Sequence, residues 1–349
     1  MKINNLLINW YNANKRDLPW RHTKDAYKIW LSEVMLQQTR VAQGLPYYEK
    51  FVDRYPTVYD MAQADEQEIL TLWQGLGYYS RARNMHATAK IVVDQYSGLF
   101  PKSYAEILSL KGIGEYTAAA ISSFAFDLPH PVVDGNVYRV ISRLFAIEEP
   151  INKPLGQKSV RTAVHAVFDT QQPALFNQAI MEFGALHCTP KKPLCTRCPL
   201  QDNCLALDKG LVDKLPLKEG KTNVKNIVHS YLYFRHKQNT YIEKRESGIW
   251  QNLHQFPLAE ENLSPSQLIK KANLLIKNKI NIEIGSCFST THLLSHRKIA
   301  AHFYTIFLDE KPIFSKSNIF EIDLEQMGTK YPTSVLTKKF LNQQKNDDK

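Results

Sequence analysis

The first 215 residues carry apolar side chains at the spacing of amphipathic α-helices. Leucine, isoleucine, valine and aromatic residues recur every three or four positions in six separate stretches, residues 6–11, 29–36, 41–51, 69–73, 87–93 and 116–126. Turns that contain proline or glycine separate these stretches, as at residues 18–19 and 98–101. This part of the chain is therefore predicted to be almost entirely helical.

The pattern changes after residue 208. Glycine, proline and lysine are frequent over residues 208–226, which predicts a linker between two domains. Beyond it, β-branched and aromatic residues predict strands at 228–234, 287–294 and 301–308, and residues 264–279 have the period of an amphipathic helix. The second domain, residues 227–345, is therefore predicted to be α+β. The last residues, 342–349, are polar and are predicted to form a mobile tail.

Composition and charge narrow the class of protein. The chain has 349 residues, too many for one ordinary core, and 44% of them are hydrophobic, as expected of a folded protein. No apolar run approaches the roughly 20 residues of a membrane helix, and the apolar stretch near the start is too short for a secretory signal. We therefore expect a cytoplasmic protein with no membrane partner.

The net charge of +10 favours an anionic partner, most often nucleic acid. The charge is unevenly distributed, because residues 1–220 carry 25 Lys and Arg against 22 Asp and Glu, whereas residues 221–349 carry 19 against 12. Any cationic surface on the first domain must therefore be local.

Four of the five cysteines fall within 17 residues, at Cys188, Cys195, Cys198 and Cys204. Thiols gathered so closely in a cytoplasmic chain favour a metal site over disulfides. The spacing predicts one compact site with four thiolate ligands, and by itself it leaves zinc and an iron–sulfur cluster as alternatives.

An acidic residue stands among apolar neighbours in the segment 29–40. On a helical projection Glu33, Gln37 and Arg40 share one face, which is flanked by isoleucine, tryptophan and leucine. A carboxyl group between apolar neighbours has a raised pKa, as a general acid requires. A solvated helix face with a few polar residues is the alternative for this glutamate taken alone.

Two further motifs suggest backbone geometry with a chemical use. Gly112 and Gly114 permit a tight hairpin with positive φ angles, which can place backbone N–H groups against a phosphate. An ordinary structural turn is the alternative.

Asp134 precedes Gly135 and a run of helix-compatible residues, so it can cap that helix. A carboxylate held there by backbone donors stays ionised and can stabilise a developing cation.

Taken in order, these segments resemble the helix–hairpin–helix DNA glycosylase superfamily. The hairpin glycines followed by residues 133–136 match its hairpin-plus-aspartate motif, and the cysteine spacing resembles the [4Fe–4S] loop of its endonuclease III branch. Within that branch the chain resembles the MutY-type adenine DNA glycosylases over residues 6–310. The other segments that carry this resemblance are 18–21, 30–39, 75–84 and 176–179.

The resemblance implies a multidomain architecture with one [4Fe–4S] cluster. An all-α helix–hairpin–helix glycosylase domain would occupy residues 1–207, with a six-helix module at about 25–130 and an iron–sulfur module formed by 1–24 and 131–207. An α+β, Nudix-like domain that recognises the lesion would occupy residues 227–345. No R-E-x-x-E-E sequence is present there, so diphosphate hydrolysis is not expected.

The resemblance also implies the activity: a monomer that removes adenine mispaired with 8-oxoguanine or guanine in double-stranded DNA. Tyr116 stands where endonuclease III-like enzymes carry a nucleophilic lysine, and a phenol cannot form a Schiff base. We therefore expect a monofunctional glycosylase that leaves the DNA backbone intact. A thymine–guanine mismatch glycosylase on the same scaffold and a lesion-binding protein without excision remain alternatives.

Residue roles follow from the same resemblance. Glu33 would protonate N7 of adenine, and Asp134 would stabilise the sugar cation or form a transient covalent adduct with the sugar. Tyr116 and Asn136 would support these two carboxyl groups. The contacts to the base and the DNA would come from Arg16, Trp20, Arg21, Gln38, Leu76, Tyr78, Gly112, Gly114, Gln178, Ser295 and His296. For Trp20 a core aromatic, and for Ser295 and His296 an ordinary strand end, are the structural alternatives.

This chain departs from the family pattern at two positions. Lys111 stands where relatives usually have proline before the hairpin, which adds a positive charge near the expected phosphate. Leu294 stands where relatives often have phenylalanine before Ser-His, so this chain lacks an aromatic ring for stacking at that position.

Overall fold

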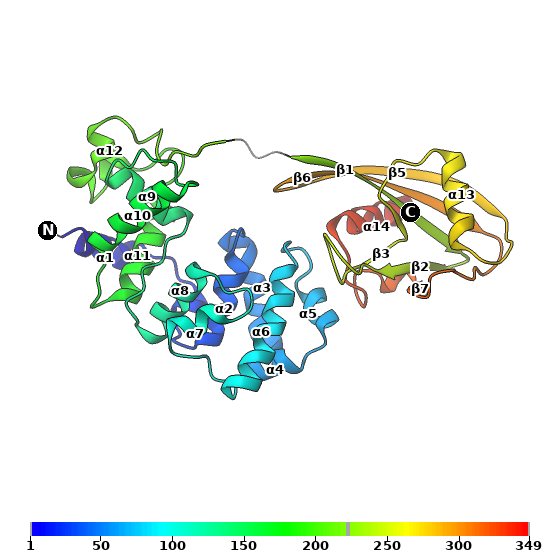
Figure 1. The fold of residues 1–349 in the computed structure, drawn as a ribbon, viewed down its shortest axis with the longest axis horizontal. Coiled ribbons are helices and arrows are strands. Elements are labelled where there is room, and N and C mark those ends of the chain that lie inside the picture. Colours follow the sequence, from blue (N-terminus) through cyan, green and yellow to red (C-terminus); the bar gives the residue numbers. More distant parts are fainter. Residues whose placement is uncertain (1, 221–223, 348–349) are drawn as a thin grey trace. The chain divides into compact units, whose positions relative to one another are not determined.

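The computed structural model describes residues 2–220 and 224–347, with side chains up to residue 344. The chain divides into two compact units (Figure 1). The first contains residues up to 63 together with those from 84 onward to the linker, and the second contains residues 64–83 together with the C-terminal part. One division between the units falls inside the predicted linker at 208–226. The difference from the prediction is that residues 64–83, expected in the helical domain, belong to the second unit.

The first unit is helical, as the periodicity predicts. Its α-helices are α1 (Ile3–Asn14), α2 (Ala26–Leu36), α3 (Val41–Arg54), α4 (Val58–Gln63), most of α6 (Ser80–Tyr96), α7 (Tyr104–Ser109), α8 (Glu115–Phe126), α9 (Gly135–Leu144), α10 (Pro154–Val167), α11 (Pro173–Leu186) and α12 (Leu205–Asp208). Short 3₁₀ turns lie at Pro19–Arg21, Cys195–Arg197 and Gln201–Asn203. Several helices begin at a capping side chain that accepts a backbone N–H, as Asp25 does for α2, Ser103 for α7 and Asp134 for α9.

Two packing contacts in this unit set the positions of the later site residues. Helix α8 is buried along most of its length and is rich in alanine, so its backbone approaches α2 closely. Helices α1, α9, α10 and α11 share one apolar core, to which α1 contributes Leu7 and Tyr11 and α11 contributes Phe176 and Phe183. Cys188, Cys198 and Cys204 pack against the same core, so the cysteine loop is anchored to α9 and α11.

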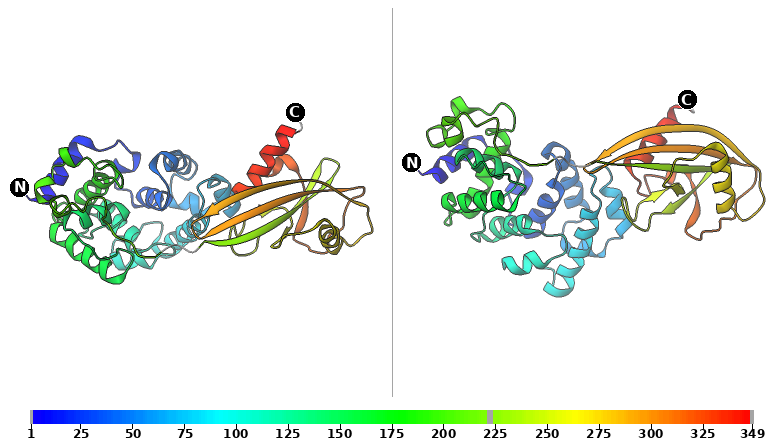
Figure 2. Two further views of the ribbon diagram at one scale, coloured as in Figure 1. Left: turned by 90° about the horizontal axis from the view of Figure 1, so that it is seen from above. Right: turned by 45° about the horizontal axis from the view of Figure 1, so that its top comes forward.

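The second unit is built on one mixed sheet. Its strands are β1 (Lys225–His236), β2 (Asn239–Lys244), β3 (His254–Gln255), β4 (Leu258–Ala259), β5 (Ile282–Leu294), β6 (Arg297–Leu308) and β7 (Ile319–Asp323). The order is β3-β2-β1-β6-β5, with β4 beside β1 and β7 beside β2. The pair β1–β6 is parallel and the other named pairs are antiparallel. In Figure 2 the long strands β1, β5 and β6 run side by side.

Successive side chains of β1 point to opposite faces of the sheet, and one helix packs on each face. Tyr231 and Tyr233 share a core with Phe340 of α14 (Val335–Asp347), whereas Leu232 and Phe234 share another with Ala272 of α13 (Pro265–Leu275). Helix α5 (Glu66–Leu72) belongs to this unit and is joined to it by hydrogen bonds to the 251–252 loop. A 3₁₀ turn lies at Leu324–Gln326.

The structure corrects two predicted boundaries. Strand β1 begins at Lys225, inside the predicted linker, because Lys225 pairs with Arg297 and its N–H donates to the carbonyl of His296. Helix α14 runs through residues 342–347, which were predicted to be a mobile tail; residues 348–349 lie outside the described part. The buried Leu336 and Phe340, four positions apart, fix this helix to the sheet.

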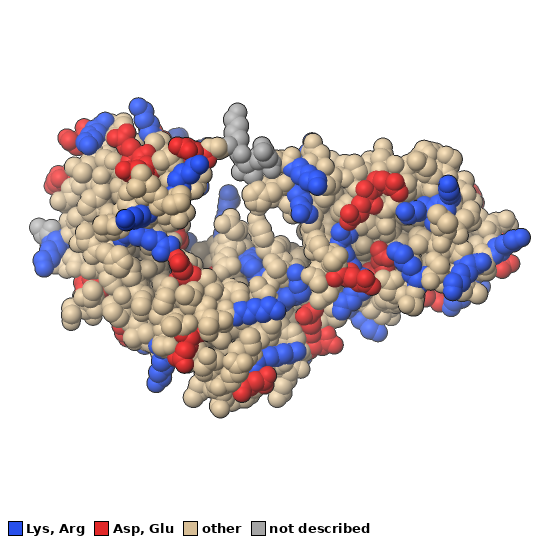
Figure 3. All heavy atoms as spheres, viewed as in Figure 1, with Lys and Arg blue, Asp and Glu red and all other residues tan. Residues whose placement is uncertain are grey.

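The surface carries charges of both signs. On the face shown in Figure 3, Lys and Arg are interspersed with Asp and Glu over both units. Among the described residues no helix is long and apolar enough to cross a membrane.

Candidate active site

A cavity of about 430 Å³ opens in the helical unit, within the ~300–1,000 Å³ typical of small-molecule sites. Its wall comes from the segment after α1, from α2, from the start of α8 and α9, and from α11. Eight of the predicted site residues line it: Arg16, Trp20, Arg21, Glu33, Tyr116, Asp134, Asn136 and Gln178. Two acidic side chains that are far apart in the sequence, Glu33 and Asp134, therefore face one cavity.

Glu33 lies on α2 with only 6% of its surface exposed. Burial raises the pKa of its carboxyl group to about 7, and the negative charge of Asp134 acts in the same direction. The hydroxyl of Tyr116 donates a hydrogen bond of 2.7 Å to Oε2 of Glu33, which together with the charge of Arg21 limits the rise. At neutral pH a large fraction of Glu33 therefore carries the proton that a general acid must donate.

Tyr116 is held in the first turn of α8, where it is half-buried and contacts Glu33 through its hydroxyl group. Burial and the neighbouring carboxylates raise the pKa of this phenol well above 10. The hydroxyl group therefore stays protonated at neutral pH and acts as a hydrogen-bond donor to Glu33.

Asp134 caps helix α9, as predicted. Its Oδ1 accepts the backbone N–H of Val137 at 2.8 Å, and its Oδ2 accepts the side-chain amide of Asn136 at 2.7 Å. Burial raises the pKa of Asp134, while these two donors favour its ionised form and act in the opposite direction. The structural role as a cap and the electrostatic role proposed from sequence thus share the same hydrogen bonds.

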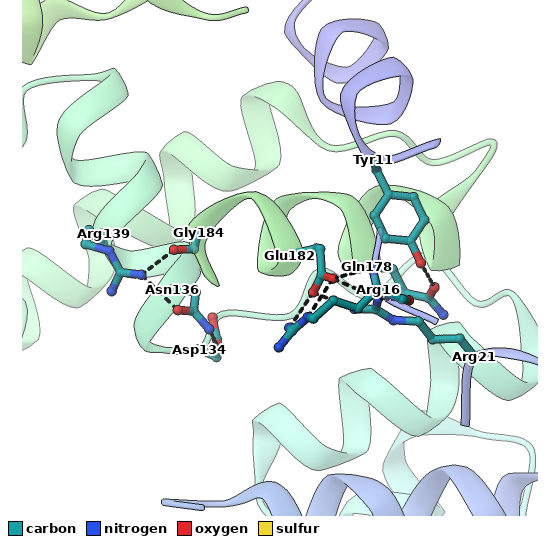
Figure 4. Close-up of polar contacts among 9 residues, drawn as sticks. All are labelled: Tyr11, Arg16, Arg21, Asp134, Asn136, Arg139, Gln178, Glu182 and Gly184. Carbon is teal, nitrogen blue, oxygen red and sulfur yellow. Dashed lines mark hydrogen bonds and ion pairs between the residues drawn. The ribbon is translucent and has the colours of Figure 1, made fainter. Parts of the chain in front are cut away.

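Asn136 is itself held by a neighbouring arginine (Figure 4). Its Oδ1 accepts a hydrogen bond of 2.9 Å from Arg139, which also donates to the carbonyls of Gly184 and Cys188. Gly184 allows the close approach of α11 to α9, since a Cβ there would lie 2.7 Å from the Cβ of Asn136. The Asp134–Asn136 pair is therefore fixed from two helices.

The base excision that the sequence resemblance implies should depend on pH through the titration of Glu33. Because the acid acts only when protonated, the rate is expected to fall as the pH rises through about 7. Single-turnover rates measured from about pH 6 to about pH 8.5 test this. A rate that stays constant or increases over that range would contradict the assignment of Glu33 as the acid.

The prediction that Glu33, Gln37 and Arg40 lie on one face of a single helix is wrong, because only Glu33 lies within α2. The helix ends at Leu36, Gln37 follows as its cap, and Gln38 takes a positive φ of 57°. Arg40 precedes α3 instead and still lines the cavity. Gln38 is exposed and lies outside the residues that line the cavity, so its predicted contact with DNA stays a prediction.

Only one of the two hairpin glycines has a backbone conformation that requires glycine. Gly112 has φ 78°, and a Cβ there would lie 2.7 Å from the Cβ of Asn84. Gly114 has φ −97° and open space around it, so the predicted positive φ is wrong at this position. The hairpin itself lies between α7 and α8, as predicted.

Trp20 fits both of its interpretations. It is buried, packs edge-to-face against Tyr48 with ring centroids 5.1 Å apart, and also lines the cavity. Gln178 on α11 accepts a hydrogen bond from the hydroxyl of Tyr11. Glu182 is among the lining residues that the sequence analysis did not name. It lies one helical turn after Gln178, and that four-residue spacing would have placed it on the same face.

A second cavity, also about 430 Å³, lies within the sheet-containing unit. Ser295 and His296 form the two-residue turn between β5 and β6 at its edge, and the hydroxyl groups of Ser295 and Tyr78 are hydrogen-bonded. Tyr78 is 50% exposed with φ 49°, whereas Leu76 is buried and lines the wall. The structure therefore brings four predicted DNA-contacting residues from two distant segments to one cavity.

The four clustered cysteines line one small apolar pocket beside α9. Arg143 donates to the sulfur of Cys188 at 3.4 Å, and the backbone N–H of Leu200 donates to that of Cys198 at 3.4 Å. Such donors and an apolar surrounding suit the thiolates of an iron–sulfur cluster. In residues 2–220 and 224–347 no group of three Cys, His, Asp or Glu side chains is arranged to bind a single metal ion. An iron–sulfur cluster does not require such an arrangement, because each cysteine binds a different iron.

Comparison with known proteins agrees with this geometry. Residues 31–162 match the family described as HhH-GPD superfamily base excision DNA repair protein, and residues 188–204 match the iron-sulfur binding domain of endonuclease III. The chain is 38% identical over 318 residues to the adenine DNA glycosylase of Buchnera aphidicola subsp. Baizongia pistaciae, covering 89% of this chain and 88% of that protein. It is 44% identical to the human adenine DNA glycosylase over 210 residues, covering 57% of this chain and 38% of the human protein.

Solved structures resemble about three fifths of the chain. A thermostable thymine-DNA glycosylase superposes with a TM-score of 0.54 at 30% identity, covering 59% of this chain and 95% of the other. An endonuclease III–DNA complex superposes with a TM-score of 0.52 at 22% identity, covering 60% and 94%, which supports the fold alone. The chain belongs to the adenine DNA glycosylase family of the HhH-GPD superfamily, and it is a base excision repair enzyme that binds DNA and an iron–sulfur cluster.

Proposed function

We propose that the enzyme hydrolyses the N-glycosidic bond of adenine mispaired with 8-oxoguanine or guanine in double-stranded DNA. The observation that carries this proposal is the convergence of Glu33 and Asp134 on one cavity of nucleobase-binding size. Base excision inside a duplex requires the nucleotide to leave the stack, at a cost of a few kcal/mol that a mismatch lowers. A buried acid and a hydrogen-bonded carboxylate are the pair that such a substrate needs.

The chemistry divides between the two carboxyl groups. Glu33 gives its proton to N7 of adenine, so that the electrons of the C1′–N9 bond leave with a neutral base. The sugar becomes an oxocarbenium-like cation beside Asp134, whose negative charge stabilises it. Water then adds to C1′ and returns a proton to Glu33, which restores the enzyme.

Two neighbouring residues maintain this division of roles. Tyr116 donates a hydrogen bond to Glu33 and Asn136 donates one to Asp134, so each carboxyl group has its own orienting partner. Since Tyr116 is a phenol and occupies the position of the lysine nucleophile in the endonuclease III branch, no Schiff base forms there. The proposed product is an abasic site in an unbroken strand.

Reading of the opposite base is assigned to the sheet-containing unit. The cavity beside the β5–β6 turn carries the Ser295 hydroxyl, the exposed Tyr78 ring and the His296 side chain, a combination of hydrogen-bonding and stacking groups. The mixed sheet with one helix on each face supports the Nudix-like description of this unit. A monomeric, cytoplasmic, nucleoid-associated enzyme belongs to the same proposal.

The substrate is tested with three duplexes that contain adenine opposite 8-oxoguanine, adenine opposite guanine, and thymine opposite guanine. The proposal expects release of adenine from the first two and no release of thymine. Release of thymine alone would instead support the thymine–guanine alternative; one similar solved structure is a thymine-DNA glycosylase. Binding without release of any base would support the lesion-binding alternative.

The cluster is proposed to be [4Fe–4S], held by Cys188, Cys195, Cys198 and Cys204. When bound, it would order the loop after α11, which brings Lys191, Lys192 and Arg197 toward the DNA backbone. The purified protein is expected to be brown and to contain about four iron and four sulfide per chain. A colourless protein that contains zinc would contradict this assignment.

A further inference from the structure

Glu182 on α11 is the buried centre of an ion cluster in the wall of the base cavity (Figure 4). Its side chain is 1% exposed and forms salt bridges with Arg16 and Arg21. Arg16 donates from Nε at 2.9 Å and from Nη2 at 2.6 Å, and its backbone N–H donates at 2.9 Å. Arg21 donates from Nη1 at 3.0 Å and from Nη2 at 2.7 Å.

This arrangement keeps Glu182 ionised. Burial alone would raise the pKa of its carboxyl group, but the hydrogen bonds from Arg16 and Arg21 outweigh it and lower the pKa to about 2. The two guanidinium groups cannot lose their protons at ordinary pH, so the three side chains carry a net charge of +1. Without the carboxylate the same wall would carry +2.

The cluster also limits where the arginines can point. Nη1 of Arg21 donates to the carbonyl of Arg16 as well as to Glu182, so both arginines are fixed to each other and to α11. Because each guanidinium group has five N–H donors, both retain donors that Glu182 does not use. These remaining donors belong to residues that line the cavity in which the base would bind.

We propose that Glu182 is a positioning residue for the proposed excision: it holds Arg16 and Arg21 in the cavity wall and cancels one of their charges, so that Glu33 keeps its proton. This rests on the proposed function of Glu33 as the acid. Glu182 does so through the arginines, and it has no contact with the reacting bond in this proposal.

The charged and titratable groups that face Glu33 come from three elements. Tyr116 approaches from α8, Asp134 from the start of α9, and Arg21 from the 3₁₀ turn before α2. Arg21 is the member of this set that favours the ionised form of Glu33 by its charge. Its pairing with Glu182 reduces that effect, because opposite charges at hydrogen-bond distance largely cancel when seen from farther away.

The test compares pH profiles of single-turnover adenine excision for the full-length enzyme and for Glu182→Gln, which keeps the shape and removes the charge. The variant is expected to lose activity at a lower pH: its rate falls about 3- to 10-fold more than that of the wild type at about pH 8, and less at about pH 6. Arg21→Met, which removes a positive charge and leaves Glu182 in place, should move the profile toward higher pH. The double variant restores the net charge of +1 and should return toward the wild-type profile.

These outcomes separate positioning from simple structural support. A uniform drop in rate at every pH for Glu182→Gln, with no movement of the profile in Arg21→Met, would overturn the proposal. If Glu182→Gln unfolds, as shown by circular dichroism, the profile of Arg21→Met still decides it. Failure of the wild-type enzyme to release adenine would refute the proposed function instead, so the two failures are distinguishable.

Discussion

Replacing Glu33 by glutamine is expected to lower the rate of adenine excision by about 100- to 10,000-fold, the range that a general acid contributes. Glutamine has the same shape but cannot donate a proton to N7 of the base. The fold should be kept, because the hydroxyl of Tyr116 can still donate to the side-chain oxygen at this position. Single-turnover release of free adenine measures the loss, and a gel-shift titration measures binding to the duplex with adenine opposite 8-oxoguanine.

A matched control is Glu148→Gln, which makes the same change at an exposed glutamate outside the cavity and should leave both measurements unchanged. If Glu33→Gln excised adenine at the wild-type rate, the proton would have to come from another group. Equal loss of binding and excision would instead indicate a role in holding the DNA.

The second large effect is expected for Asp134→Asn. Removal of its negative charge should lower excision by about 100- to 1,000-fold, as for other groups that stabilise charge in a transition state. Asparagine caps helices about as well as aspartate, so the hydrogen bond from Val137 and the stability of α9 should persist. Single-turnover excision and the midpoint of thermal unfolding measure the two roles separately.

Asp134→Ala is the comparison that reports the capping role. It should lose the charge and also about 1 kcal/mol of stability, because the first turn of α9 loses its capping acceptor. If Asp134→Asn kept full activity while Asp134→Ala lost it, capping alone would explain this residue, and its proposed electrostatic role would be wrong.

The local patterns of the sequence account for most of the fold. The helical half and the strands β1, β5 and β6 were predicted because apolar spacing and β-branched residues report local structure directly. Helix α14 was missed because the composition of residues 342–349 is polar, and its two buried anchors lie earlier, at Leu336 and Phe340. The grouping of 64–83 with the sheet could not be predicted, since it depends on long-range hydrogen bonds such as that between Glu66 and Asn252.

The residues of the candidate site could be predicted from the sequence for a different reason. Glu33, Tyr116 and Asp134 each belong to a short motif that can be recognised in the sequence, and the structure brings them to one cavity. Glu182 belongs to no such motif. Its importance arises from Arg16 and Arg21, more than 160 positions away in the chain, and only the packing of α11 against the segment after α1 brings them together.

The most direct measurement of the central claim is the fate of both products from one duplex that holds adenine opposite 8-oxoguanine. Chromatography identifies the released base, and a denaturing gel run before and after alkali reports the state of the strand. In the proposed mechanism Glu33 protonates the adenine and water adds to the sugar. This mechanism predicts free adenine together with a strand that breaks only after alkali. A strand cut without alkali, or no free adenine while the duplex is bound, would contradict it.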